Sequence, residues 1–424
     1  MLKIFSANMI NQSGGKSEKI AAVLNLSIPL LMGVYIFFNP FPHTTAIKEF
    51  SFYISLLALM TLIISRKTNF SLHSPLTLPL VLFLLWGIIG LFFALDLANS
   101  LHDIRAHFVK YLLIYYLLVN YFNSSEKLEI LSWIVIASAT IFSLWATIDY
   151  YLIDGNPFAR RLGETFLEIH TDYIGFVLIF ALTLALNKLL QNKTLLAKSL
   201  LVISAFILCL TTLLTQSRGS LIALFVAMII FSFYNKKILI LLLISILLVI
   251  IIPGFKERID PKTMLQNERL QMNALTMEII KDYPLAGIGF GMQIYGNEHI
   301  IDIKTFDSRL PKKYQGGVGG KFIGSPHNTL LDIAVRTGII GLILFLSVIL
   351  TAIWMLWQAG KSAKSEYFKS WIICISAALA SFMTAALFAD TAFGPQAVVF
   401  YTILAIITIL WKIIIRNKSE NSTA

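Results

Sequence analysis

Apolar runs about as long as a membrane is thick recur through the whole chain and limit what it can fold into. A helix that crosses a bilayer needs about 20 largely apolar residues, whereas the strands of a membrane barrel alternate over only ~10 residues. We identify twelve apolar runs, at roughly 20–38, 46–65, 76–94, 106–122, 128–150, 171–190, 197–215, 219–234, 237–253, 337–357, 368–388 and 396–414. The sequence therefore predicts an all-α integral membrane protein with about twelve transmembrane helices.

Composition supports this class and argues against two others. Of the 424 residues, 57% are hydrophobic and only 13% are charged, against about 25% charged in a soluble domain. The net charge of +11 does not predict a nucleic-acid partner, because the basic residues fall mostly between the apolar runs, where topology and anionic membrane lipid account for them. Cys209 and Cys374 both lie inside apolar runs, so we expect neither a disulfide framework nor a zinc site. The sequence contains no HExxH, CxxC, Walker or GxSxG motif, and we expect no metal and no cofactor.

The positions of the basic residues predict the orientation of the chain. If the N-terminus is cytoplasmic, every short loop on the cytoplasmic side carries lysine or arginine, for example Arg66 and Lys67 or Lys236 and Lys237. The opposite short loops hold little beyond Arg105, Arg160, Arg161 and Arg218. Basic residues concentrate in cytoplasmic loops of membrane proteins, so we expect both termini in the cytoplasm.

One long segment lies on the outer side and divides the chain into three parts. We expect transmembrane helices in 1–253, an outer loop domain in 254–336, and further transmembrane helices with a cytoplasmic tail in 337–424. Within the loop domain, Leu270, Ala274, Met277 and Ile280 follow helical spacing, and Pro284 with a glycine cluster would end that helix. The stretch "FDSRLPKKYQGGVGGKFIG" then predicts a mobile loop over a site.

Two arginines on the outer side are candidates for binding phosphate. Arg218 lies between two apolar runs in "LLTQSRGSLIALF", with Gly219 beside it to permit close approach of a ligand. Its guanidinium is either a cation that reaches from a helix end to the membrane surface or a planar donor for a phosphate. Arg269, near the start of the predicted loop helix, is by itself more typical of a solvated surface.

A histidine precedes the tenth apolar run in "GSPHNTLLDIAVRTGIIG". Pro326 restricts the backbone before His327, and Asn328 is a good helix N-cap, so the imidazole is expected on rigid backbone at the outer membrane surface. Such a histidine is often only a capping residue. An imidazole, however, has an ordinary pKa near 6.5, which makes His327 the natural candidate for a general base.

Three more charged residues lie on the outer side. Asp390, at the outer end of the eleventh run, either orients a histidine or arginine or simply ends a helix. Arg160 and Arg161, in "NPFARRLGETFLEIHTDYIG", form a basic loop, with His170 and Asp172 following. A solvated basic loop is the simpler interpretation of the two arginines, and substrate binding is the alternative.

The order of these motifs resembles a known family. "TQSRGSLIAL", "NERLQMNALTMEIIKDYPLAGIGFG" and "SPHNTLLDIAVRTGIIGL" together look like the core of the O-antigen ligase and polymerase family of bacterial envelope assembly. The resemblance in motifs covers roughly residues 155–345, and the layout of apolar runs extends it over the chain. "HTDYIG" departs from the family's more usual histidine–proline–asparagine form.

The resemblance implies a metal-independent, inverting glycosyltransferase of the C-type membrane fold in the bacterial inner membrane. Such enzymes take a glycan from an undecaprenyl diphosphate carrier at the periplasmic face, and ligases transfer it to lipid A-core. By position, Arg218 and Arg269 match the family's essential arginines, His327 its essential histidine, and Asp390 its outer acidic residue. We expect Arg160, Arg161, Asn328 and Asp390 to contribute to substrate binding.

Two alternatives remain open at the level of sequence. A polymerase of the same family transfers the glycan to another carrier-linked repeat unit and would use the same residues. A transporter with twelve helices belongs to a different class, but transporter sites lie near the membrane midplane. Here the candidate residues gather at one face and the apolar runs contain few acids, which favours a reaction at the membrane surface. A protein-glycosylating relative is a further option.

Overall fold

The computed structural model describes residues 15–163, 171–251, 268–316, 325–394 and 396–422. Helices make up 77% of the structure, and the described residues contain no strand, which confirms the predicted all-α class. The helices of the first half are α2 (Lys16–Phe38), α3 (Thr45–Ile64), α4 (Thr77–Gly90), α5 (Leu97–Asp103), α6 (Lys110–Tyr121), α7 (Ser125–Thr147), α8 (Thr171–Gln191), α9 (Leu195–Leu214), α10 (Arg218–Tyr234) and α11 (Ile238–Ile251).

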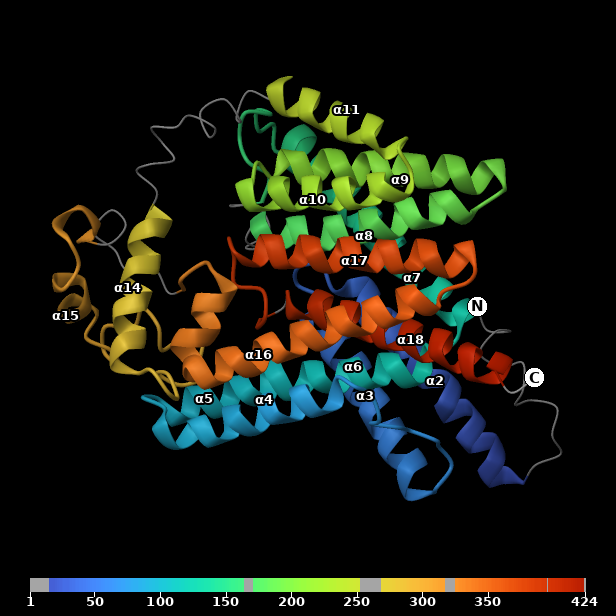
Figure 1. Cartoon of the computed structure of the whole chain (residues 1–424), viewed down its shortest axis with the longest axis horizontal. Helices are drawn as coiled ribbons and strands as arrows, with labels where there is room; N and C mark the ends of the chain where they lie inside the picture. Colours follow the sequence, from blue (N-terminus) through green and yellow to red (C-terminus); the bar gives the residue numbers. More distant parts are fainter. Residues whose placement is uncertain (1–14, 164–170, 252–267, 317–324, 395, 423–424) are drawn as a thin grey trace.

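The second half continues with α14 (Glu268–Asp282), α15 (Ile303–Ser308), α16 (Thr329–Ser362), α17 (Glu366–Ala386) and α18 (Ala397–Ser422). Short 3₁₀ segments are η1 (Leu91–Phe93) and η4 (Lys312–Tyr314), and two π-helical segments, η2 (Ile104–Val109) and η3 (Ile148–Ile153), extend α5 and α7. The helices run side by side as a bundle, with α14 and α15 beyond one end (Figure 1).

Each predicted apolar run overlaps one of these helices. Eight helices in the described part of the chain are long and apolar enough to cross a membrane, and α4 with η1, α10 and α11 are shorter apolar helices. The number of spans, twelve, therefore stays a prediction. The fourth predicted run, 106–122, is the second part of a longer helical segment that begins with α5 at Leu97.

The core of the bundle surrounds α8 and α18. In the most apolar stretch of each, 89% and 78% of the residues are buried, against 33% for α3 and α9. Apolar side chains on all faces are typical of a helix that is enclosed by others rather than facing lipid on one side. Among the neighbouring pairs, α2 packs on α3, α10 on α17, and α16 on α4.

The outer segment has a hydrophobic core of its own. Leu275 and Ile279 of α14, Phe306 of α15 and Val335 of α16 are buried together in it. The Thr276 and Tyr295 hydroxyls are 2.7 Å apart, and burial raises the pKa of the Tyr295 hydroxyl well above its usual value, so this hydroxyl stays protonated and able to donate a hydrogen bond. The outer segment is thus a folded unit that continues into the start of α16.

The structure bears on two predictions about the outer segment. The predicted helix is confirmed as α14, which ends at Asp282 just before Pro284; Leu270 and Met277 are exposed on it, whereas Met272, Leu275, Ile279 and Ile280 are buried. The stretch expected to be mobile begins in α15 and includes η4, with Leu310 buried. Residues 317–324 of that stretch lie outside the described residues.

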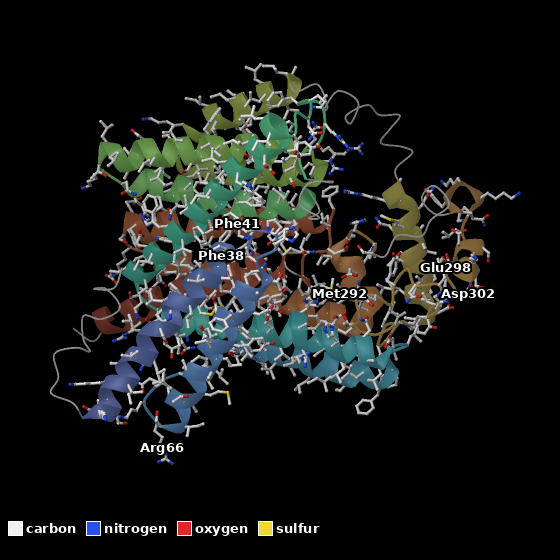
Figure 2. The ribbon with its side chains drawn as sticks, turned by 180° about the vertical axis from the view of Figure 1, so that it is seen from behind. Phe38, Phe41, Arg66, Met292, Glu298 and Asp302 are labelled. Atoms are coloured by element: carbon white, nitrogen blue, oxygen red, sulfur yellow. The ribbon has the colours of Figure 1, made fainter. Side chains whose placement is uncertain are left out.

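The two ends of the bundle carry different segments. Arg66, after α3, lies at the end remote from Glu298 and Asp302, which belong to the outer segment, and Met292 lies between these two extremes (Figure 2). Arg66 was predicted on the cytoplasmic side and the outer segment on the opposite side. The fold therefore places Arg66 and the outer segment at opposite ends of the bundle, in agreement with the prediction that they lie on opposite sides of the membrane.

Candidate active site

His327 immediately precedes α16 and has an unusual backbone conformation. Its φ is 47°, in the left-handed region that costs most residues conformational energy and is tolerated better by histidine, asparagine and aspartate. Asn328 caps the helix as predicted, because its side-chain oxygen accepts hydrogen bonds from the Leu330 and Leu331 amides at 3.0 and 3.3 Å. The cap and the local strain fix the position from which the imidazole projects.

Asp390 lies beside His327, although 63 residues separate them in sequence. The Asp390 Oδ2 atom is 3.9 Å from His327 Nδ1, and the side chains are 15% and 27% exposed. Ser325 links the two, because its hydroxyl donates to Asp390 Oδ2 and accepts a hydrogen bond of 3.2 Å from the His327 amide. Of the two interpretations of Asp390, the geometry favours a carboxylate that faces the histidine over a residue that only ends a helix.

The turn that contains Asp390 is fastened to the first residue of α16. The Thr329 hydroxyl donates to the Ala389 carbonyl at 2.7 Å and accepts from the Thr391 amide at 2.9 Å. Thr329 and Thr391 are fully buried, so these bonds are protected from competition with water. The start of α16 and the turn 388–391 therefore form one rigid unit that carries both members of the His327–Asp390 pair.

Phe388 brings both candidate arginines to the same turn. The Arg269 guanidinium carbon is 5.8 Å from the centre of the Phe388 ring, within the range of a cation–π contact. On the other side, Gly219 packs so closely that a Cβ atom on it would lie 2.7 Å from Phe388 Cβ. Gly219 was predicted to make room for a ligand next to Arg218; instead it makes room for Phe388, and that prediction was wrong.

Arg218 is the first residue of α10, and one nitrogen atom of its side chain is buried. The Arg218 Nε atom is buried and has no hydrogen-bond partner among the described residues. A buried donor without an acceptor is costly and needs an explanation, such as a ligand that supplies the acceptor. The N-terminus of a helix adds partial positive charge at the same place. The arrangement suits an anion better than a cation that only reaches for the membrane surface.

The loop with Arg160 and Arg161 is anchored just before Arg218. Arg161 Nε donates to the Thr215 carbonyl at 3.3 Å, and the Gln216 side-chain amide donates to the Phe158 and Ala159 carbonyls. Arg160 is exposed and donates to the Asn156 side chain at 2.9 Å. Arg161 is thus held near Arg218, whereas Arg160 fits the simpler interpretation of a solvated basic residue. His170 and the side chain of Asp172 lie outside the described residues.

The structure therefore gathers Arg269, His327 and Asp390 around the turn 388–391, and Gly219, the neighbour of Arg218, packs against the same turn. Sequence reasoning missed Phe388 and Ser325. Ser325 had a usable signal, since a hydroxyl two residues before a histidine can bond to that residue's amide. Phe388 had none, because its contacts come from segments more than a hundred residues away.

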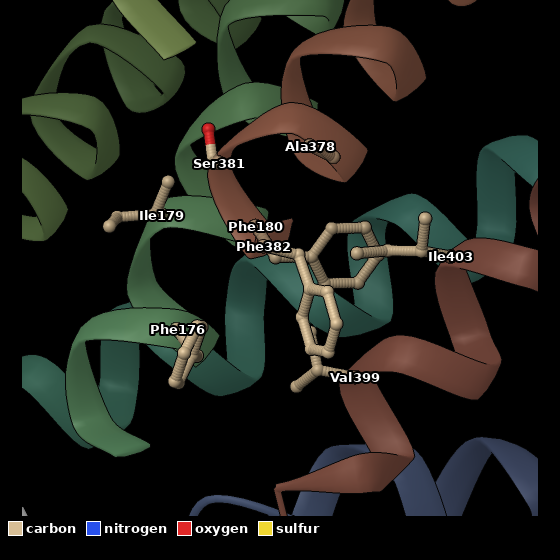
Figure 3. Close-up of a pocket in the computed structure, with 8 residues that line it drawn as sticks. All are labelled: Phe176, Ile179, Phe180, Ala378, Ser381, Phe382, Val399 and Ile403. Atoms are coloured by element: carbon tan, nitrogen blue, oxygen red, sulfur yellow. The ribbon is translucent and has the colours of Figure 1, made fainter. Parts of the chain in front are cut away.

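Two cavities among the described residues lie away from these charged residues. One lies between α8, α17 and α18 and is apolar apart from Ser381; its lining consists of Phe176, Ile179, Phe180, Ala378, Ser381, Phe382, Val399 and Ile403 (Figure 3). A second involves Asn39, Ser138 and Thr402. Neither of these two cavities is lined by an acid or a base.

In the part of the chain that the structure describes, no group of three or more histidine, cysteine, aspartate or glutamate side chains is arranged to hold a metal ion.

Comparison with known families is consistent with this arrangement. Residues 203–346 match the family model described as O-antigen ligase. Over this region the chain is similar to the O-antigen ligase family. The matched residues include Arg218, Arg269 and His327, whereas Asp390 and the loop with Arg160 and Arg161 lie outside them. No curated protein matches the chain.

The match over residues 203–346 and the apolar helices together indicate the general class. The chain is a multi-pass membrane protein and has a function of the O-antigen ligase and polymerase type. The resemblance that the motifs suggested is thereby confirmed at the level of the family.

Proposed function

We propose that this protein transfers a glycan from undecaprenyl diphosphate to lipid A-core at the periplasmic face of the inner membrane. The observation that supports the proposal most directly is that Arg269 and the His327–Asp390 pair lie at one turn, 388–391, against which Gly219, the neighbour of Arg218, also packs. The reaction needs a base for the acceptor and positive charge for the leaving group, and this turn brings candidates for both together.

In the proposed reaction, His327 takes the proton from the attacking hydroxyl of the acceptor. The oxygen forms a bond to the anomeric carbon while the bond from that carbon to the diphosphate oxygen breaks, so one displacement inverts the configuration. Asp390, 3.9 Å from His327 Nδ1, orients the imidazole and stabilises the imidazolium that forms. His327 is thus the first group to carry the proton away from the acceptor hydroxyl.

The departing undecaprenyl diphosphate is a good leaving group and needs positive charge rather than an acid. Arg218 supplies this charge with a buried donor that has no partner among the described residues and with the N-terminus of α10 behind it. Arg269 approaches from α14 across Phe388. Arg161 and the exposed Arg160 add positive charge for the donor's phosphates, and Asn328 keeps the base in place. The mechanism uses neither a metal ion nor another cofactor.

The experiment is transfer from an undecaprenyl-diphosphate-linked glycan to purified rough lipopolysaccharide by the full-length protein in detergent, with a chelator present. We expect the wild type and a His299→Ala control, altered at an exposed histidine of the same outer segment, to transfer glycan. His327→Ala should lose about 10²–10⁴-fold in rate.

Other outcomes would lead to different assignments. Elongation of the carrier-linked glycan without transfer to lipopolysaccharide would indicate the polymerase reaction, and transfer to a protein acceptor a protein-glycosylating enzyme. Transfer in detergent, where no compartments exist, would argue against a transporter. Full activity of His327→Ala would contradict the proposed base.

A further inference from the structure

A break divides α16 into two pieces, and the first piece carries the proposed base. Gly338, inside α16, has φ 70° and ψ −178°, a conformation that is open essentially to glycine alone. A Cβ atom at this position would lie 1.8 Å from the Leu285 carbonyl oxygen. Residues 329–337, which we name the half-helix, are turned away from the long remainder of α16 (Figure 1).

Four backbone groups next to the break have hydrogen-bond partners outside α16. The Val335 and Arg336 carbonyls accept hydrogen bonds from the Ile288 and Gly289 amides at 2.8 and 3.1 Å. The Ile339 amide donates to the Pro284 carbonyl at 2.8 Å, and the Trp86 indole donates to the Thr337 carbonyl at 2.8 Å. Residues 284–293, which we name the strap, thus replace the missing helical hydrogen bonds, as a broken helix at membrane depth requires.

The strap is fastened on its other side to α5. Three consecutive amides, those of Gly291, Met292 and Gln293, donate to side chains of α5. Their acceptors are Ser100 at 3.2 Å, Asp103 at 2.6 Å and Asn99 at 3.1 Å. The strap therefore connects the half-helix to α5.

Arg336 is the side chain that joins the half-helix to the strap. Its Nε is 2.6 Å from Asp332 Oδ1, one turn earlier, and the two side chains are 2% and 4% exposed. Its Nη1 donates to the Gly291 carbonyl of the strap. A buried ion pair is often no more stabilising than an apolar pair of the same size, and its best-supported use is to specify one geometry. A contribution to stability alone is thus a weak explanation for an arginine at position 336.

We propose that Arg336 is a positioning residue for the transfer reaction. Together with Asp332 it holds the half-helix against the strap, and it thereby fixes where His327 stands relative to Arg218 and Arg269. Arg336 does not touch substrate. The proposal rests on the proposed function, because it concerns the placement of the base.

The test compares Arg336→Lys, Arg336→Met and Trp86→Phe with wild type in the transfer assay, per folded full-length molecule. A reacting group displaced by about 1 Å can cost ~10²-fold in rate. We therefore expect kcat to fall about ten- to a hundred-fold for the Arg336 variants and less for Trp86→Phe, with KM for the donor within about three-fold of wild type. Arg309→Ala, which removes an exposed ion pair with Asp282 in the same outer segment, is the control and should keep both constants.

Hydrogen exchange of the peptides that cover 329–337 supplies a readout that needs no activity. The Arg336 variants should exchange at least about ten-fold faster there than wild type or Arg309→Ala.

An unchanged kcat per folded molecule, a change in KM alone, or unchanged exchange in Arg336→Lys would overturn the inference. If the wild type transfers no glycan, the proposed function fails and the exchange experiment still decides whether Arg336 holds the half-helix. If Arg336→Met does not fold, Arg336→Lys and Trp86→Phe carry the test.

Discussion

At the scale of single residues, the strongest indication of a ligand is the Arg218 Nε atom, which is buried without a partner among the described residues. We predict that Arg218→Ala lowers kcat for transfer by about 10²–10³-fold, because the charge on the departing diphosphate loses a preorganised donor. Arg218→Lys should recover only part of this, since an ammonium cannot reproduce the planar set of donors. The measurement is steady-state transfer, with Arg309→Ala, at a partly exposed arginine of the outer segment that pairs with Asp282, as the control; equal losses in both would argue against a specific role for Arg218.

Asp390 gives a second prediction at this scale. In Asp390→Asn the neutral amide cannot stabilise the imidazolium of His327, from which Asp390 Oδ2 is 3.9 Å distant in the native protein. We expect kcat to fall by about 10²-fold or more while donor binding is retained. Binding of the carrier lipid and single-turnover transfer would be measured side by side, and Asp302→Asn, at an exposed carboxylate of the outer segment, serves as the control. Loss of donor binding in Asp390→Asn would instead make Asp390 a substrate-binding residue.

The sequence predicted these residues individually but not how they meet. Residue type and placement near apolar runs single out Arg218, His327 and Asp390, because ionisable groups near membrane depth are expensive to keep. Their meeting depends on Phe388, which packs on Gly219 and lies under Arg269. Such contacts between distant segments follow from how helices pack, and a single sequence does not contain that information in a local pattern.

At the scale of elements, Gly338 makes the break in α16 possible and yields a prediction about stability. Gly338→Ala forces a residue with a Cβ into a glycine conformation and against the Leu285 carbonyl oxygen. We expect a loss of more than about 2 kcal/mol in the free energy of unfolding. The unfolding midpoint in detergent measures this, with Gly360→Ala on the same helix as control.

The control should behave in the opposite way. At Gly360 a Cβ would meet only Ile372 Cγ2 at 3.7 Å, and alanine has the higher helix propensity, so Gly360→Ala should be neutral or stabilising by up to ~1 kcal/mol. A Gly338→Ala protein as stable as the control would show that the break is not required for folding.

Apolar periodicity predicted the membrane helices and the outer helix α14, but it did not indicate which face of α14 is buried. The runs are long and continuous, so each overlaps a helix of the bundle whichever face meets its neighbours. In α14, apolar residues lie on several faces, and the stripe through Leu270 and Met277 fits helical spacing as well as the one through Leu275 and Ile279, which is buried. The choice depends on the partners of α14, among them Phe306 and Val335, which the helix's own sequence does not specify.

At the scale of the whole molecule, the charge pattern predicts which end of the bundle faces the cytoplasm. Arg66 and Glu298 lie at opposite ends (Figure 2), and both are exposed. The native cysteines, Cys209 and Cys374, are buried and should give little background. A membrane-impermeant maleimide applied to intact spheroplasts should therefore label Glu298→Cys and leave Arg66→Cys unlabelled until the membrane is permeabilised.

This experiment tests whether the candidate residues can meet a lipid-linked donor outside the cytoplasm. Arg269 and His327 belong to the same outer segment as Glu298, so labelling of Glu298→Cys from outside places their end of the bundle at the periplasmic face. Labelling of Arg66→Cys alone would indicate the opposite orientation, with the candidate arginines on the cytoplasmic side of the membrane. That result would contradict transfer from undecaprenyl diphosphate at the periplasmic face. Retained transfer activity in each cysteine variant is the check that the labelled protein is the folded one.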